Sequence, residues 1–157
     1  MVKASSEDLL LYWKPKTADD ILKREDVLDY VASDQLRRAS TGDVVWVVTV
    51  YDGELFLLDK LHIGAVTDRN GAIKQLGEKD VWGNKKHYAI AAPGKVESLK
   101  KISLGNVAHK LVFKSVNKES ARLNIDAHSK VNAQQLQTMR TLEESSEDLL
   151  EQIWRLG

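Results

Sequence analysis

The chain has 157 residues, no cysteine, and 23 basic and 23 acidic side chains. This length suits one domain with its own core, and the lack of cysteine excludes a disulfide framework or a thiolate zinc site. The amino terminus lacks the apolar run of a signal peptide, and no stretch approaches the ~20 apolar residues of a membrane span. We therefore expect a single cytoplasmic domain over residues 1–157.

The first third of the chain predicts a strand followed by two helices. The apolar run Leu9–Trp13 is typical of a strand and is followed by Lys14 and Pro15, where a central strand would lose an amide donor. Thr17 and Asp20 have the spacing of a helix cap, and apolar residues then continue on one face to about Tyr30. Ser33 or Asp34 would cap a second, short helix that ends near Arg38.

The middle of the chain predicts an antiparallel hairpin. Thr41-Gly42-Asp43 is typical of a turn, and Asp52-Gly53 is a hairpin signal that would pair Val44–Tyr51 with Glu54–Ala65. Further elements are expected beyond it: a short helix over Ala72–Leu76 ended by Gly77, and strands over His87–Ala91, Leu111–Phe113 and Leu123–Ile125.

The carboxyl end predicts a helix. Thr141 and Glu144 have the spacing of a capping box, and Leu149, Leu150, Ile153 and Trp154 follow on one face. Strands mixed with helices, without regular alternation, predict an α+β fold: a curved mixed sheet or small β-barrel with peripheral helices.

Charge is unevenly distributed along the chain. Residues 85–122 hold nine Lys or Arg against two Asp or Glu, whereas the segments on either side are net acidic. Such a basic segment can bind a phosphate backbone, although a solvated lysine-rich surface explains it equally well. The candidate phosphate contacts are Arg37, Arg38, Lys85, Lys86, His87 and Lys95.

A candidate base-reading pocket lies just before the central strand. Tyr30, Ser33, Asp34 and Gln35 combine an aromatic ring with hydrogen-bonding groups in a loop, where binding residues concentrate. The Asp34 carboxylate would accept from the exocyclic amine of cytosine or adenine, with cytosine preferred. The alternative for Ser33 and Asp34 is helix capping, and the two roles can coexist.

Five further residues complete the candidate pocket: Trp13, Lys14, Trp46, Trp82 and Tyr88. Trp13 and Trp82 are the best stacking candidates because each adjoins a turn, next to Lys14 and Lys85. Trp46 lies within a run of valines, where a core position is the stronger alternative, and Tyr88 is a half-buried core residue in its alternative role. The four histidines lack metal-ligand spacing, so we expect no metal and no cofactor.

The order of these elements resembles the EVE domain, a branch of the PUA superfamily related to YTH domains. The resemblance rests on Tyr12-Trp13-Lys14-Pro15, on Tyr30, Ala32, Asp34, Arg38, Gly42 and Asp43, on Asn132–Leu142, and on the helix at Leu150–Trp154. It is closest to the amino-terminal domain of EVE–HNH restriction endonucleases and spans nearly the whole chain. The family often has asparagine where this chain has Asp34, which only accepts hydrogen bonds when ionised.

The resemblance implies a nucleic-acid-binding module that flips a modified base, 5-methylcytosine or 5-hydroxymethylcytosine in DNA, into an aromatic and polar pocket. It would act as the specificity domain of a modification-dependent restriction nuclease whose HNH-type domain lies elsewhere, so this chain is not expected to be an enzyme. Alternatives are a reader of modified bases in RNA and a small, metal-independent PUA-like ribonuclease. A third is a protein-interaction domain, suggested by the acidic carboxyl-terminal helix.

Overall fold

The computed structural model describes residues 6–77, 81, 85–114, 121–128 and 130–157. The predicted hairpin forms the centre of the sheet: β3 (Val44–Tyr51) runs antiparallel to the 14-residue strand β4 (Glu54–Thr67). Asp52 and Gly53 both have positive φ, 50° and 80°, as a two-residue hairpin turn requires. The hairpin prediction is confirmed.

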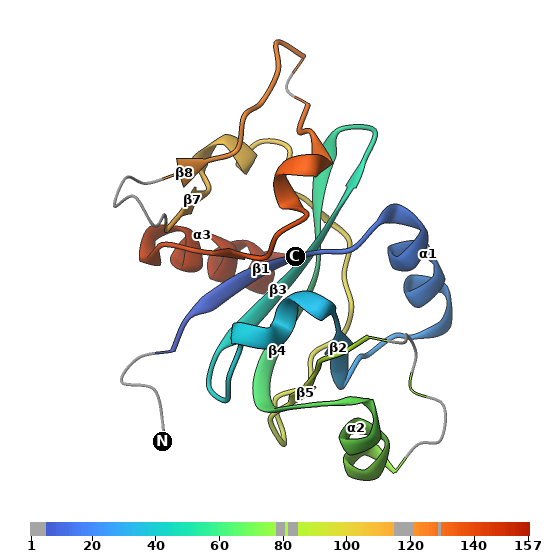
Figure 1. Ribbon diagram of the computed structural model, residues 1–157. Coiled ribbons are helices and arrows are strands. Elements are labelled where there is room, and N and C mark those ends of the chain that lie inside the picture. The colour runs from blue at the N-terminus through green and yellow to red at the C-terminus, as the bar shows by residue number, and fades with distance from the viewer. Residues whose placement is uncertain (1–5, 78–80, 82–84, 115–120, 129) are drawn as a thin grey trace.

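The central hairpin is extended on both sides into a seven-stranded mixed sheet (Figure 1). The strand order is β2-β5-β4-β3-β1-β9, with β6 also paired to β4 and with β1 parallel to β3. The other strands are β1 (Asp8–Tyr12), β2 (Tyr30–Ala32), β5 (Tyr88–Ala91), β6 (Ile102–Ser103) and β9 (Arg140–Thr141). Its edge strands β2 and β9 do not pair with each other in the described chain, so the mixed α+β sheet is confirmed and the small barrel is wrong.

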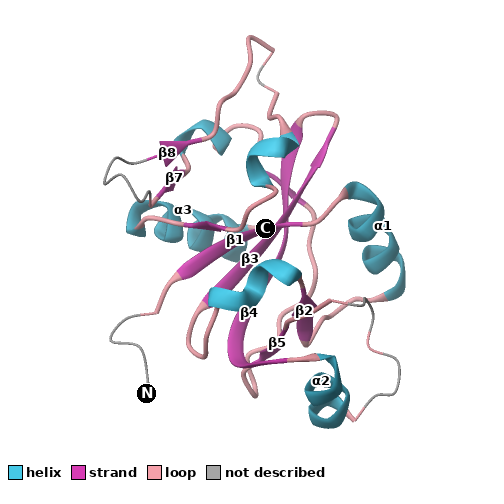
Figure 2. Ribbon diagram, viewed as in Figure 1, coloured by secondary structure: helices cyan, strands magenta, loops and turns pink. Residues whose placement is uncertain are grey.

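Three α-helices and three short 3-10 helices surround this sheet in the described residues (Figure 2). Strands β7 (Val112–Phe113) and β8 (Ala121–Arg122) form a separate two-stranded ribbon. The helices are α1 (Pro15–Arg24), α2 (Arg69–Leu76), α3 (Glu144–Leu156), η1 (Asp34–Arg38), η2 (Ala108–Lys110) and η3 (Ala133–Leu136).

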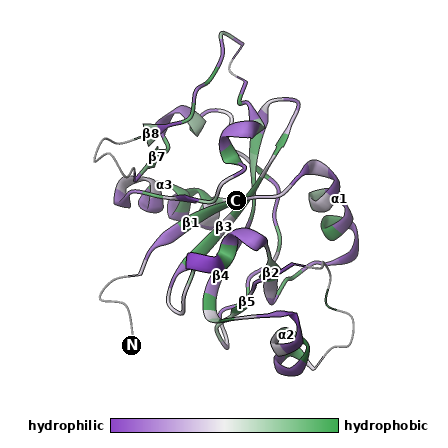
Figure 3. Cartoon of the chain, in the orientation of Figure 1, coloured by the Kyte–Doolittle hydropathy of each residue, from purple (hydrophilic) through white to green (hydrophobic). Residues whose placement is uncertain are grey.

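The sheet separates two apolar clusters, one on each face. Alternate residues of β1 point to opposite sides, so Leu9 and Leu11 join one cluster while Leu10 joins the other. Helix α1 covers the first cluster with Ala18 and Ile21, and α3 covers the second with Leu150 and Trp154. Figure 3 shows the resulting pattern, with apolar strands inside and helices that are hydrophilic on their outer sides.

Several predicted boundaries are wrong for local reasons. Helix α1 begins at Pro15, whose missing N–H costs nothing at the first helical position, rather than at a Thr17 cap. It ends at Arg24 because the next residues pair with another segment. The Asp26 backbone carbonyl accepts from the Leu99 amide, and Val27 forms an isolated β-bridge with Ser98. The predicted helix was expected to continue to about Tyr30, but Tyr30–Ala32 forms strand β2. Strand β6 was not predicted, and helix α2 begins at Arg69 instead of Ala72.

Tertiary pairing overrides local signals toward the carboxyl end. Thr141 pairs with β1 as part of β9, so the predicted capping box does not form and α3 begins at Glu144. The predicted strand Leu123–Ile125 is reduced to an isolated bridge between Ile125 and Val131. The apolar face of α3 is confirmed, since Leu150 and Trp154 are buried.

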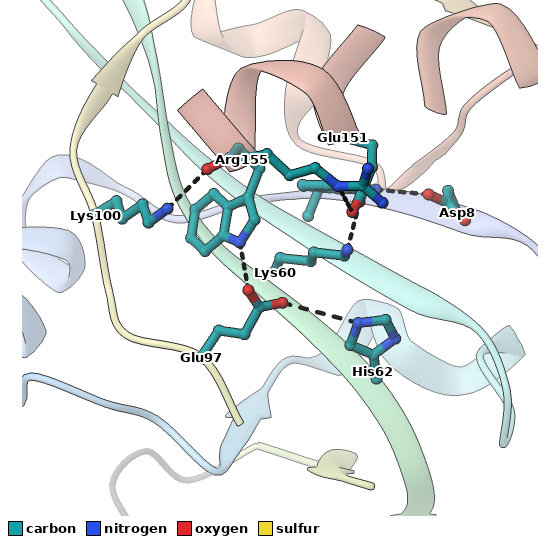
Figure 4. A network of polar contacts seen from close by, with 9 residues as sticks. Asp8, Lys60, His62, Glu97, Lys100, Glu151 and Arg155 are labelled. Carbon is teal, nitrogen blue, oxygen red and sulfur yellow. Dashed lines mark hydrogen bonds and ion pairs between the residues drawn. The ribbon is translucent and has the colours of Figure 1, made fainter. Parts of the chain in front are cut away.

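A network of polar contacts fastens α3 to the sheet (Figure 4). Lys60, 8% exposed, pairs with Glu151, and the Trp154 Nε1 donates to Glu97 Oε1 at 2.8 Å. Burial alone would raise the pKa of the Glu151 carboxyl, but its hydrogen bonds and charge contacts with Lys60 and Arg155 lower it. Charged groups are therefore tolerated beside the second cluster because each has a partner.

Asp59 is a buried carboxylate of a different kind. It lies in β4 with 1% of its surface exposed, and neither oxygen makes a hydrogen bond of normal geometry to the described residues. Burial raises the pKa of Asp59 from 3.8 to about 7, with the Lys60 amide opposing the shift and Glu97 adding to it. The folded protein therefore holds this proton more tightly than the unfolded chain does.

We expect the free energy of unfolding to fall as pH rises from about 4 to about 7, by an amount of the order of 4 kcal/mol from Asp59. The D59N variant should lose this component and be more stable than the wild type near pH 8. Denaturant unfolding of both chains near pH 5 and pH 8 measures the difference.

D43N is the matched control, because the buried Asp43 carboxylate accepts hydrogen bonds from the backbone amides of Glu7 at 3.0 Å and Ser40 at 3.1 Å. Replacing that acceptor by an amide should destabilise the protein at both pH values. Parallel pH profiles for the wild type and D59N would contradict the assignment.

Candidate nucleic-acid interface

Most of the predicted pocket lines one hollow, here called cavity A, of about 530 Å³. Its walls come from the end of β1, the start of α1, the β2–η1 junction and two separate loops. The lining residues are Tyr12, Trp13, Lys14, Thr17, Ala32, Ser33, Asp34, Gln35, Lys85 and Gln137. Five of these ten were predicted for the pocket: Trp13, Lys14, Ser33, Asp34 and Gln35. Lys85 was predicted as a phosphate contact but lines cavity A.

Trp13 is held firmly at the bottom of cavity A. Its backbone N–H donates to Val48 at 2.9 Å, and its carbonyl accepts from the Thr49 hydroxyl at 2.8 Å. The side chain is 4% exposed and packs in the first apolar cluster. Little of this indole is therefore open to a ligand in cavity A.

Two hydrogen bonds fix the first residues of η1. The Ser33 hydroxyl accepts from the Gln35 amide at 3.0 Å, so its predicted capping role is confirmed. Asp34 Oδ1 accepts from the Lys86 amide at 2.8 Å and joins η1 to the segment before β5. Its other oxygen, Oδ2, makes no hydrogen bond to the described residues and is available to a ligand.

A second hollow, cavity B, of about 370 Å³, adjoins cavity A. Asp34 and Gln35 line both, so they form the border between them. The predicted phosphate contacts Arg37, Arg38, Lys86 and His87 line cavity B together with Thr138 and Met139. Arg38 Nη2 also donates to the Met139 carbonyl at 2.6 Å, which fixes the guanidinium.

The remaining predicted site residues lie elsewhere. Trp46 is completely buried, its ring 6.2 Å from that of Trp154 and its Nε1 2.7 Å from Asp8 Oδ2, so its core alternative is correct. Tyr30 and Tyr88 are buried in a third cluster beneath α2, with their rings 6.2 Å apart. Trp82 lies outside the described residues.

Lys95 lies away from both cavities. At one end of the β2–β5 pair the Ser33 amide bonds to the His87 carbonyl, and at the other the Ala91 amide bonds to the Asp29 carbonyl. Lys95 comes after the Asp29–Ala91 end of this strand pair, whereas both cavities lie at the Ser33–His87 end.

Sequence reasoning missed several lining residues. Tyr12 and Thr17 lie one turn or less from predicted residues, whereas Gln137, Thr138 and Met139 arrive from the far end of the chain. Their only signal was that they belong to the Asn132–Leu142 stretch that carried part of the resemblance.

Burial raises the pKa of Tyr12, so its hydroxyl is a hydrogen-bond donor at neutral pH.

Another hollow, near the hairpin tip at Gly53, has a volume of about 510 Å³ but polar groups that bond to one another. Gln135 Oε1 accepts from the Asn124 amide at 2.6 Å, and its Nε2 donates to the Asn124 carbonyl at 2.9 Å. Among the described residues no group of three metal-ligating side chains is suited to a metal ion. In the part of the chain that the structure describes, no helix is both long enough and apolar enough to cross a membrane.

Comparison of the chain with protein-family models, curated proteins and solved structures finds no match. The EVE-like resemblance therefore remains a prediction, and the site is interpreted from its geometry.

We expect Asp34→Ala to release the segment before β5, because the variant removes the acceptor of the Lys86 amide. Hydrogen exchange at Lys86 should accelerate, while Asp34→Asn, which keeps a carbonyl oxygen, should exchange nearly as slowly as the wild type. Asp126→Ala is the matched control, since Asp126 accepts from the His128 and Lys130 amides at 2.8 and 2.9 Å in a distant loop. Unchanged exchange in Asp34→Ala would show that this bond does not position the segment.

Proposed function

We propose that the chain is a nucleic-acid-binding module that reads a single flipped base, a 5-modified cytosine in DNA, in cavity A. The observation that carries the proposal is the adjacency of two unlike hollows. Cavity A is lined by two aromatic residues, polar groups and two lysines, whereas cavity B has Arg37, Arg38 and Lys86 but no aromatic ring other than His87. Asp34 and Gln35 belong to both. A nucleotide has this same division between its base and its phosphate.

The size of cavity A supports this assignment. Its volume of about 530 Å³ falls within the range of about 300–1,000 Å³ typical of small-ligand pockets, so one base fits with room for a substituent. Asp34 Oδ2 supports cytosine, whose exocyclic amine is a donor, and Gln35 and Gln137 add amide groups that both donate and accept.

Recognition must depend on base edges more than on stacking. Unstacking a base costs a few kcal/mol, and full stacking on an aromatic side chain returns about 1–3 kcal/mol. Trp13 is only 4% exposed and supplies less than this, and half-buried Tyr12 is the other described aromatic residue in the lining. Hydrogen bonds to Asp34 and the neighbouring amides therefore carry the larger share.

The modification itself contributes a smaller amount. Burying one methyl group contributes about 0.8 kcal/mol, which corresponds to roughly a fourfold preference over unmodified cytosine. A hydroxymethyl group would also require a hydrogen-bond partner, which Gln137 or Lys14 would supply. The graded preference expected from this chemistry suits the specificity module of a modification-dependent restriction nuclease.

A second candidate function is favoured by three residues of cavity A. Tyr12, Lys14 and Asp34 line it together, and these are the side-chain types with which a metal-independent ribonuclease would work. Cleavage of labelled RNA that disappears in Lys14→Gln would replace the reading function by this one.

We expect an electrophoretic titration to rank matched duplexes that carry cytosine, 5-methylcytosine, 5-hydroxymethylcytosine or N6-methyladenine. The modified cytosines should bind best, and Asp34→Asn should weaken their binding by about tenfold, because an amide N–H then faces the cytosine amine. Asp126→Asn serves as the control and should leave binding unchanged. Equal binding of all four duplexes would refute base reading, and preference for single-stranded RNA would transfer the function to RNA.

We expect the salt dependence to locate the phosphate contacts. Lys86→Gln should reduce the slope of log K against log salt by about 0.9, the value for one lost contact on duplex DNA. Lys95→Gln, at the other end of β5, should leave the slope unchanged. Similar slopes for both variants would show that cavity B does not hold a phosphate.

A further inference from the structure

Cavities A and B continue into a third hollow. Cavity C, of about 440 Å³, shares Arg38, Thr138 and Met139 with cavity B and extends to Glu7, Lys114 and Thr141. One stretch of chain lines all three: Gln137 faces cavity A, residues 138–139 face cavities B and C, and residues 140–141 face cavity C. The three hollows therefore form one groove along a common wall.

The length of this groove follows from β1, which runs beside that wall. Leu9 pairs with Thr141 and Leu10 with Arg140, so the wall is antiparallel to β1. Glu7 at the start of β1 lines cavity C, and Trp13 just past its end lines cavity A. Six residue steps at about 3.3 Å separate the two by about 20 Å.

Positive charge continues along the groove beyond cavity A. Arg37, Arg38 and Lys86 line cavity B, and Lys114 and Arg140 line cavity C, where Glu7 is the only carboxylate among the described lining residues. Arg140 is held over the Phe113 ring at 4.5 Å, and a guanidinium fixed in this way retains donors for a further partner. Lys114 is exposed, and its positive charge acts on Glu147, where it opposes the rise in pKa that burial causes.

We propose that this groove holds the strand that carries the read base, with its phosphates running from Lys86 past Arg38 to Lys114 and Arg140. The protein would then contact several nucleotides on one side of the base and few on the other. A length of about 20 Å accommodates at most roughly six phosphates, the number at the 3.4 Å axial spacing of a duplex strand, and fewer in an extended strand; single-stranded sites span about 4–16 nucleotides. This inference rests on the proposed function, because it takes the read base to lie in cavity A.

The test uses single-stranded DNA oligonucleotides with one 5-methylcytosine, extended by one nucleotide at a time on its 5′ side or its 3′ side. Fluorescence anisotropy with the full chain should show affinity rising over at most about six nucleotides in one series and remaining flat in the other. Lys114→Gln should weaken binding of the longest oligonucleotide in the favoured series by about fivefold and leave the shortest unaffected. Lys110→Gln is the matched control, an exposed lysine four residues earlier that lines none of the three cavities.

The outcomes separate the groove from base reading. Equal gains in both series, or equal effects of the Lys114 and Lys110 variants, would overturn the groove while leaving a base preference intact. A one-sided gain that Lys114→Gln removes, but that is the same for methylated and unmethylated cytosine, would support the groove and refute base reading. Absence of binding by every oligonucleotide would overturn both.

Discussion

The candidate interface depends on the joint between η1 and the segment that precedes β5. The Ser33 amide bonds to the His87 carbonyl at 3.0 Å, and Asp34 Oδ1 accepts from the Lys86 amide at 2.8 Å. These contacts bring together residues separated by about fifty positions in the chain and place Lys85 on one hollow and Lys86 on its neighbour. Asp34 is therefore a structural acceptor through one oxygen, and we propose that its other oxygen contacts the ligand.

The distribution of indoles determines how such a site can recognise a base. Trp154 of α3 packs edge to face against Trp46 of β3. The ring N–H of Trp46 donates to Asp8, and that of Trp154 donates to Glu97. Their burial is stabilising because the large apolar area leaves water while the one polar atom keeps a partner. Since Trp13 is almost completely buried as well, the selectivity of the proposed interface would depend mainly on hydrogen bonds.

Local signals predicted the elements whose geometry is decided locally. The hairpin at Asp52-Gly53, the Ser33 cap and the helix end at Gly77 with φ of 68° were all predictable, because each depends on turn or cap chemistry. Thr141 shows the limit: its capping pattern was outweighed by pairing with β1, a contact between the two ends of the chain. For the same reason five of the ten cavity A residues were predicted for the pocket, whereas Gln137 was not. Trp46 is buried in the second cluster, in agreement with the core position that its run of valines favoured.

The central claim is that a modified base enters cavity A beside Asp34. The most direct measurement is a two-dimensional NMR titration of the full chain with a short oligonucleotide that contains one 5-methylcytosine. The account predicts that the largest shift changes occur at Ser33–Gln35, Lys85, Lys86 and the Trp13 indole N–H, with little change around Asn124 and Asp126. Changes centred on the Asn124–Asn132 hollow, or none at the β2–η1 junction, would contradict it.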